Sequence, residues 1–121
     1  MKNGPALSVD YMLLYQMCRD PKFFSAVPVF AFMQPQATAI TQQIVDAVLG
    51  IRNCGHCGND IKQLMAPLMQ QFTSVVIQLA STNREALTPL VTYVAGRRGF
   101  RPVPLRVYHR DRDGRIAAVE L

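Results

Sequence analysis

The chain has 121 residues, half of them apolar, and a formal net charge of +5. A chain of this length is the size of one domain and can bury a core of its own. The apolar content excludes an intrinsically disordered protein. Tryptophan is absent, so we expect a core built largely from Leu, Ile, Val, Ala and Met. We treat residues 1–121 as a single domain.

The cysteine count and the apolar runs indicate the compartment. Three cysteines are an odd number, which argues against the disulfide framework of a secreted protein. The first residues carry no apolar signal segment, and no stretch approaches the ~20 uninterrupted apolar residues of a membrane span. We therefore expect an intracellular, cytoplasmic protein that makes no membrane contact.

The first predicted helix covers about 9–19, where apolar residues recur at helical spacing and Ser8 can act as its N-cap. The pair Asp20-Pro21 ends it, because the residue before a proline disfavours the helical region. Residues 23–33 combine β-branched and aromatic side chains with a proline. This run is compatible with an extended, buried connector or with a short helix.

Two further helices are predicted over about 36–49 and 60–80. Pro35 favours the start of the first, because a missing N–H costs nothing in a first turn. Asn59 or Asp60 can cap the second. This second helix is strongly amphipathic. Its apolar stripe consists of Ile61, Leu64, Met65, Leu68, Phe72, Val75, Val76 and Leu79.

A fourth helix is predicted over about 83–95. Thr82 and Glu85 have the spacing of a capping box at its start. Two prolines, Pro67 and Pro89, fall inside predicted helices, and each removes a backbone hydrogen bond. We expect a bend or a break at each of them.

The hydrophobic period changes to two near the end of the chain. One face of the predicted strand carries Val103, Leu105, Val107 and His109, and the other carries Pro104, Arg106, Tyr108 and Arg110. Residues 111–114 contain the Asp and Gly of a tight turn, and 115–121 are the return strand. The predicted fold class is therefore α+β and mostly α. About four helices form a small bundle over residues 1–96, and an arginine-rich β-hairpin follows over 97–121.

Positive charge is concentrated in this last segment. Residues 1–96 carry six basic and five acidic side chains, whereas 97–121 carry seven basic and three acidic ones. All seven bases are arginines, whose planar fork pairs with carboxylate or phosphate. A lone hairpin is marginal in water, so it must lie on the helices or join strands of another chain. The predicted partner-binding residues are Arg97, Arg98, Arg101, Arg106, Tyr108, Arg110, Arg112 and Arg115.

The segment Cys54-Gly-His-Cys57 permits three chemistries. Both thiolates can bind zinc, since the pair resembles half of a zinc-knuckle site. Cys18, His56 and His109 are the remaining soft ligands that could complete four-fold coordination, unless two chains each supply a pair. In the second interpretation the pair is a redox dithiol, since the tetrapeptide resembles the one found in protein disulfide isomerases. In this chain, however, a helix is predicted before it instead of a strand. The third interpretation is a turn with ordinary reduced thiols.

The sequence carries no recognisable catalytic arrangement. Residues 111–114 resemble the start of a calcium loop, but the closing Glu is missing. We therefore expect a non-enzymatic assembly or adaptor subunit that binds other protein subunits through its hairpin, in a homo- or hetero-oligomer. A component of a large particle such as a phage virion would suit this profile. The alternatives are a nucleic-acid-binding protein that uses the arginines and a small zinc-binding or thiol-switch module.

Overall fold

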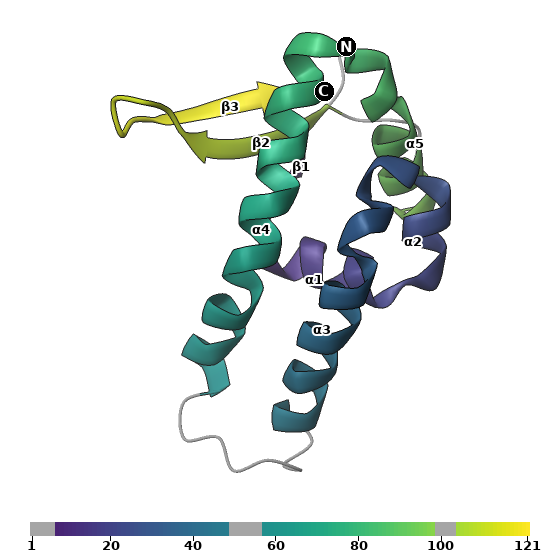
Figure 1. Ribbon diagram of the computed structural model, residues 1–121, viewed down its shortest axis with the longest axis vertical. Helices are drawn as coiled ribbons and strands as arrows, with labels where there is room; N and C mark the ends of the chain where they lie inside the picture. Colours follow the sequence, from purple (N-terminus) through teal and green to yellow (C-terminus); the bar gives the residue numbers. More distant parts are fainter. Residues whose placement is uncertain (1–6, 49–56, 99–103) are drawn as a thin grey trace.

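The computed structural model describes residues 7–48, 57–98 and 104–121, in which helices predominate and a small sheet lies at one end (Figure 1). The α+β, mostly α class is confirmed. In chain order the elements are β1 (Leu7–Ser8), α1 (Tyr11–Arg19), α2 (Pro21–Ala26), the 3-10 helix η1 (Pro28–Met33), α3 (Gln34–Val48), α4 (Cys57–Thr82), the 3-10 helix η2 (Arg84–Leu87), α5 (Thr88–Arg98), β2 (Leu105–Arg110) and β3 (Ile116–Glu120).

Helix α4 is the longest element and the centre of the packing. It contacts α1, α3, η1 and η2, and it also contacts both strands of the hairpin. In Figure 1 α3 runs beside it and the hairpin projects from its upper half. Phenylalanines form the middle of the core: the rings of Phe30 and Phe72 stack at 4.8 Å, and Phe23 lies 5.7 Å from Phe30. All three side chains are completely buried.

The ambiguous run 23–33 is helical, divided between α2 and η1. A proline stands in the first turn of each piece, where its missing N–H leaves no hydrogen bond unmade. Asp20 caps α2 by accepting a hydrogen bond from the Lys22 N–H at 3.0 Å. The same residue is the C-cap of α1, so α1 ends where the Asp20-Pro21 pair predicts.

Two predicted helix starts are wrong. The cap of α1 is Asp10, whose carboxylate accepts from the Leu13 N–H at 2.8 Å, whereas Ser8 belongs to a strand. Helix α4 begins at Cys57, so Asn59 and Asp60 lie inside its first turn and do not precede it. Asp10 therefore takes the place predicted for Ser8, and α4 begins earlier in the chain than predicted.

The predicted fourth helix is in fact two elements, η2 and α5. The Thr82 hydroxyl donates to the Gln78 carbonyl of the preceding helix at 2.8 Å, so it does not cap the next one. Pro89 is the second residue of α5 and marks its first turn, which accounts for the predicted break. Pro67 is accommodated inside the continuous helix α4.

The hairpin prediction is confirmed, and the structure adds a third strand to it. β2 and β3 pair in antiparallel register, with Arg106 opposite Glu120 and Arg110 opposite Ile116. The two-residue strand β1 pairs in parallel with the start of β2, which gives the order β1-β2-β3. Gly114 has a φ of 78°, the left-handed conformation that the turn requires.

Candidate functional site

The base of the hairpin is fixed to the chain's own helices. Leu105 and Val107 on β2 are each 1% exposed, and Val119 and Leu121 pack against the same core. The Arg84 guanidinium of η2 also donates a hydrogen bond to the Glu120 carbonyl. One of the two predicted possibilities for the hairpin is therefore realised within this chain, since the hairpin lies on its own helices.

The opposite face of the hairpin is open. Arg106, Tyr108 and Arg110 alternate on this face of β2 with the buried positions, as the sequence pattern predicts. The register places Ala118 beside Tyr108 and Ile116 beside Arg110. Tyr108 is 46% and Ile116 is 59% exposed, which leaves an aromatic and an aliphatic side chain in solvent between arginines.

The charges on this face are partly paired. The Arg106 guanidinium lies 2.9 Å from a Glu120 carboxylate oxygen and donates to the Tyr108 hydroxyl at 3.3 Å. This hydrogen bond from Arg106 lowers the pKa of Tyr108 and raises that of Arg106. Residues 104–121 together carry four arginines and three carboxylates. The described hairpin is therefore almost neutral and carries charges of both signs.

The side chains around the turn differ in how firmly they are held. The Asp111 carboxylate accepts from the N–H groups of Asp113 and Arg115 at 2.9 Å, so it is part of the turn itself. Arg110 donates to the Gly114 carbonyl at 2.8 Å. Arg112 and Arg115 are exposed. The tip of the hairpin therefore presents arginines on a well-defined turn.

The backbone edges of the hairpin are also open near the tip. In antiparallel strands, residues alternate between pointing their backbone groups at the partner strand and away from it. Leu105 and Leu121 exchange both their hydrogen bonds, so the odd-numbered residues pair within the hairpin. Ile116 and Ala118 therefore direct their N–H and C=O groups outward, and no described residue pairs with them.

The second edge of the hairpin has the same property. β1 contacts only the start of β2, where the Val9 N–H donates to the Arg106 carbonyl at 3.0 Å. Beyond that point Tyr108 and Arg110 direct their backbone groups outward, again without a backbone partner among the described residues. In the part of the chain that the structure describes, the outer half of the hairpin is thus a two-stranded ribbon with both edges open.

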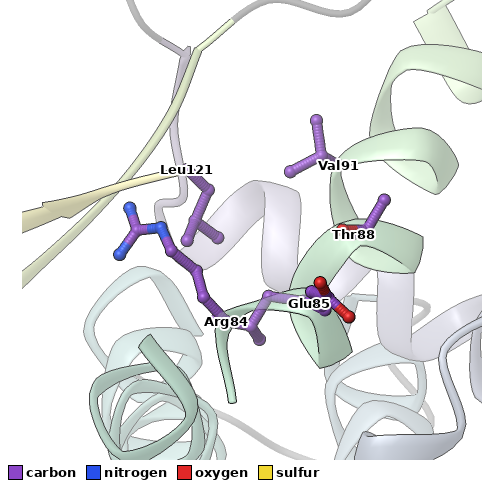
Figure 2. A pocket seen from close by; sticks show the side chains of 6 residues that line it. Arg84, Glu85, Thr88, Val91 and Leu121 are labelled. Carbon is purple, nitrogen blue, oxygen red and sulfur yellow. The ribbon is translucent and has the colours of Figure 1, made fainter. Parts of the chain in front are cut away.

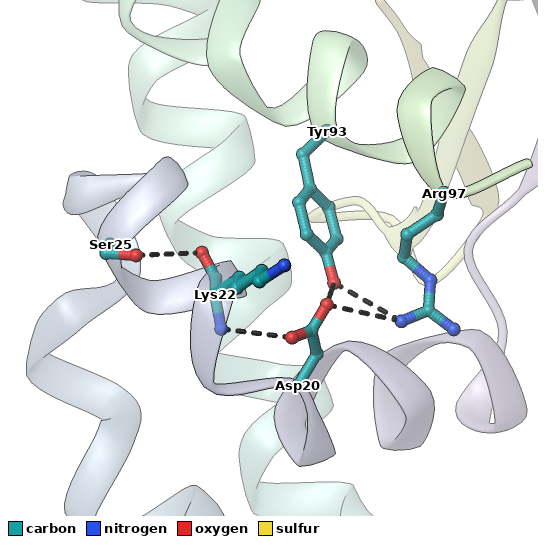
Figure 3. Close-up of polar contacts among 5 residues, drawn as sticks. All are labelled: Asp20, Lys22, Ser25, Tyr93 and Arg97. Carbon is teal, nitrogen blue, oxygen red and sulfur yellow. Dashed lines mark hydrogen bonds and ion pairs between the residues drawn. The ribbon is translucent and has the colours of Figure 1, made fainter. Parts of the chain in front are cut away.

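Arg97 does not belong to this surface. It lies on α5, where its guanidinium is 3.5 Å from the Asp20 carboxylate and donates to the Tyr93 hydroxyl at 3.3 Å (Figure 3). Tyr93 itself donates to Asp20 at 2.6 Å. Arg97 is therefore part of a link between the α1–α2 junction and α5. The Arg98 side chain and Arg101 lie outside the described residues.

This link shifts two pKa values. Burial and the hydrogen bond to Asp20 raise the pKa of Tyr93 to about 12. The same hydrogen bond, followed by that from the Lys22 N–H, lowers the pKa of Asp20. Both shifts favour an ionised Asp20 and a neutral Tyr93, which is the pair of states that the hydrogen bond needs. No local sequence pattern indicates this contact, because Asp20 and Tyr93 lie far apart in the chain.

The predicted metal ligands are only partly placed by the structure. Cys54 and His56 lie outside the described residues, as does the side chain of Cys57, while His109 is on β2. Cys18 is buried in α1, and burial raises the pKa of its thiol to about 12. Within the described ranges, no three His, Cys, Asp or Glu side chains gather into a group that could hold a metal ion.

Thiol counting, together with metal analysis, separates a zinc site from a pair of reduced cysteines. We expect Cys18 to resist a thiol reagent near neutral pH in the folded protein and to react after denaturation, because its thiolate is disfavoured. Two rapidly reacting thiols and no metal would identify Cys54 and Cys57 as ordinary reduced cysteines. Bound zinc in protein purified without chelator, with no fast thiols, would identify a metal site. If Cys18→Ser has the same number of fast-reacting thiols as the parent, the slow thiol is that of Cys18.

A cavity lies where the hairpin meets the helices. It has a volume of about 290 Å³ and is lined by Arg84, Glu85, Leu87, Thr88, Val91 and Leu121 (Figure 2). The Arg84 guanidinium already donates to the Glu120 carbonyl. Arg84, the cation on the cavity wall, therefore helps to hold the hairpin on the helices.

A larger apolar groove of about 670 Å³ lies between α1, α3 and α4. Its walls include Tyr11, Met12, Tyr15, Ile44 and Val48.

Among the helices that the structure describes, none is long and apolar enough to cross a membrane. Comparisons with protein families, with curated proteins and with solved structures find no match for this chain.

Proposed function

We propose that this chain is a non-enzymatic assembly or adaptor subunit that binds other proteins through the outer half of its hairpin. The observation that carries the proposal is the ribbon of β2 and β3, whose two outer backbone edges are left open by residues 7–48, 57–98 and 104–121. Open edges of this kind accept an added strand, which supplies main-chain hydrogen bonds to a partner. The helices already anchor the base, so the outer half is presented at a fixed position.

The side chains of the exposed face suit a protein partner. Tyr and Arg are enriched in the centres of protein interfaces, and here Tyr108 lies between Arg106 and Arg110. Ile116 adds an exposed apolar contact on the neighbouring strand. Arginines among carboxylates favour a partner surface with charges of both signs. A larger assembly, of which a phage virion is one example, would supply such a surface.

The near-neutral hairpin argues against the nucleic-acid alternative. Binding to a phosphate backbone depends on an excess of cations that displace counterions. The described hairpin has four arginines against three carboxylates, and Arg106 is already paired with Glu120. Protein binding is therefore the function that this surface supports best.

The experiment is site-specific photo-crosslinking in cells of the organism that encodes the chain. A benzophenone amino acid replaces Tyr108, which keeps an aromatic ring at that position, and the matched control replaces Gln78 on the exposed side of α4. We expect a discrete protein adduct from position 108 and none from position 78. No protein adduct at 108, or equal adducts at both positions, would contradict the proposal.

A binding assay with a fluorescent single-stranded oligonucleotide tests the alternative. We expect no binding at moderate salt, or weak binding that the double variant Arg106→Ala/Arg110→Ala leaves unchanged. Binding that falls steeply with salt and is lost in the double variant would instead identify the hairpin as a nucleic-acid surface. In that case the protein-binding proposal would be abandoned.

A further inference from the structure

The outer edge of β3 is suited to pairing with another strand. Ile116 and Ala118 turn their N–H and C=O groups away from β2, with no partner among the described residues. Exposed edges are normally protected by a lysine, a proline or a bulge. β3 has the sequence Ile-Ala-Ala-Val-Glu, contains neither lysine nor proline, and pairs with β2 in an unbroken register. None of these protective devices is present on this strand.

One end of the edge is already occupied, and this limits the register of any added strand. The Glu120 carbonyl accepts a hydrogen bond from Arg84. The open groups are therefore those of Ile116 and Ala118, with Ala117 between them. An added antiparallel strand that uses all four groups must present two outward-facing residues separated by one residue.

β3 itself has this arrangement, and we propose that the edge pairs with the β3 edge of a second copy of this chain. A two-fold axis beside Ala117 places Ile116 of each copy opposite Ala118 of the other. Each of these pairs can exchange two hydrogen bonds, so all the open groups of both copies are used. This inference rests on the proposed function and names the partner.

The side chains fit this register. The two copies of Ala117 meet at a position where antiparallel strands come closest, and alanine is small enough for that approach. On the exposed face, Ile116 gains the Ala118 of the second copy as a neighbour, with that copy's Tyr108 on the next strand. Exposed apolar surface is thereby covered on both copies.

The charges are complementary in the same register. The carboxylate of Glu120 lies at one end of β3, and the turn with Arg112 and Arg115 lies at the other. An antiparallel arrangement brings Glu120 of each copy toward the arginine-bearing turn of the other. The two-fold axis repeats this approach, so opposite charges meet at both ends of the paired strands.

The test is the mass of the purified full chain by sedimentation equilibrium, from low-micromolar to sub-millimolar concentration. We expect a concentration-dependent dimer. Ala118→Pro removes one outward N–H from the edge while leaving the hydrogen bonds to β2 intact, so the dimer dissociation constant rises on the order of tenfold or more. The control Ala118→Ser keeps this N–H and leaves the dimer unchanged.

A second pair of variants keeps the test decisive if Ala118→Pro does not fold. Ile116→Lys places a charge at an exposed position of the edge, and we expect it to weaken the dimer similarly. Val48→Lys makes the same change at an exposed apolar position on α3 and should leave the dimer unchanged. A parent chain that stays monomeric, or a dimer that resists both edge variants, would overturn self-pairing. A monomeric parent that still crosslinks to a different protein at position 108 would overturn self-pairing alone and retain the proposed function.

Discussion

Replacing Phe30 with alanine is expected to lower the free energy of unfolding by about 3–5 kcal/mol, as measured by urea titration. The Phe30 ring is completely buried and stacks on both Phe23 and Phe72. Its removal leaves a buried cavity between Phe23 of α2 and Phe72 of α4, which solvent cannot fill from the surface. Since domains of this size are stable by about 5–15 kcal/mol, the variant should lose a large share of its stability.

Phe32 provides the matched control two residues away. Its side chain is 59% exposed on the same 3-10 helix, so Phe32→Ala should change the free energy of unfolding by no more than about 0.5 kcal/mol. Both variants remove the same atoms and alter the same local helix propensity. Equal losses in the two variants would show that η1 is packed differently from the arrangement described above.

Replacing Asp20 with alanine is expected to cost about 2–3 kcal/mol at neutral pH. Loss of the α2 N-cap accounts for about 0.5–2 kcal/mol, and loss of the hydrogen bond from Tyr93 to a carboxylate accounts for much of the rest. The ion pair with Arg97 is partly exposed and adds little. A thermodynamic cycle with Tyr93→Phe isolates the hydrogen bond, and additive losses would show that the two groups do not interact.

The same carboxylate predicts a pH dependence. The pKa of Asp20 is lowered in the folded protein, so its stabilisation is fully present above the ordinary carboxyl pKa of about 3.9. It is lost as the pH falls through the lower folded-state value, because the unfolded chain then binds the proton first. As the pH falls from about 3.9 to the lowered pKa of Asp20, stability should therefore fall less steeply in Asp20→Ala than in the parent. If the free energy of unfolding of the two proteins depends on pH in the same way, Asp20 does not contribute to the loss of stability in acid.

The helices and the hairpin were accessible from the sequence because their signals are local. Periodicity located α1, α3 and α4, and alternation with an Asp- and Gly-containing turn located β2 and β3. The start of α1 was misplaced because Ser8 and Asp10 are equally good caps, and only the pairing of Ser8 with β2 separates them. The division of η2 from α5 agrees with the break predicted at Pro89, which lies in the first turn of α5.

The features that define the candidate surface depend on distant contacts. Alternation placed Arg106, Tyr108 and Arg110 on one face, but the exposure of Ile116 depends on which side of the hairpin α4 covers. Arg97 is excluded from this surface by its contact with Asp20, which lies at the α1–α2 junction near the other end of the chain. No local pattern in a single sequence encodes a contact of this kind.

The parallel pairing of β1 with β2 constrains the order in which the molecule is completed. Leu7 lies opposite Leu105, so strands from nearly opposite ends of the chain must meet before the sheet is whole. During synthesis the helices can begin to pack while Leu7 and Ser8 still lack their partner strand. The sheet, and with it the proposed binding surface, is therefore among the last parts to form. A chain interrupted before residue 105 would present helices without it.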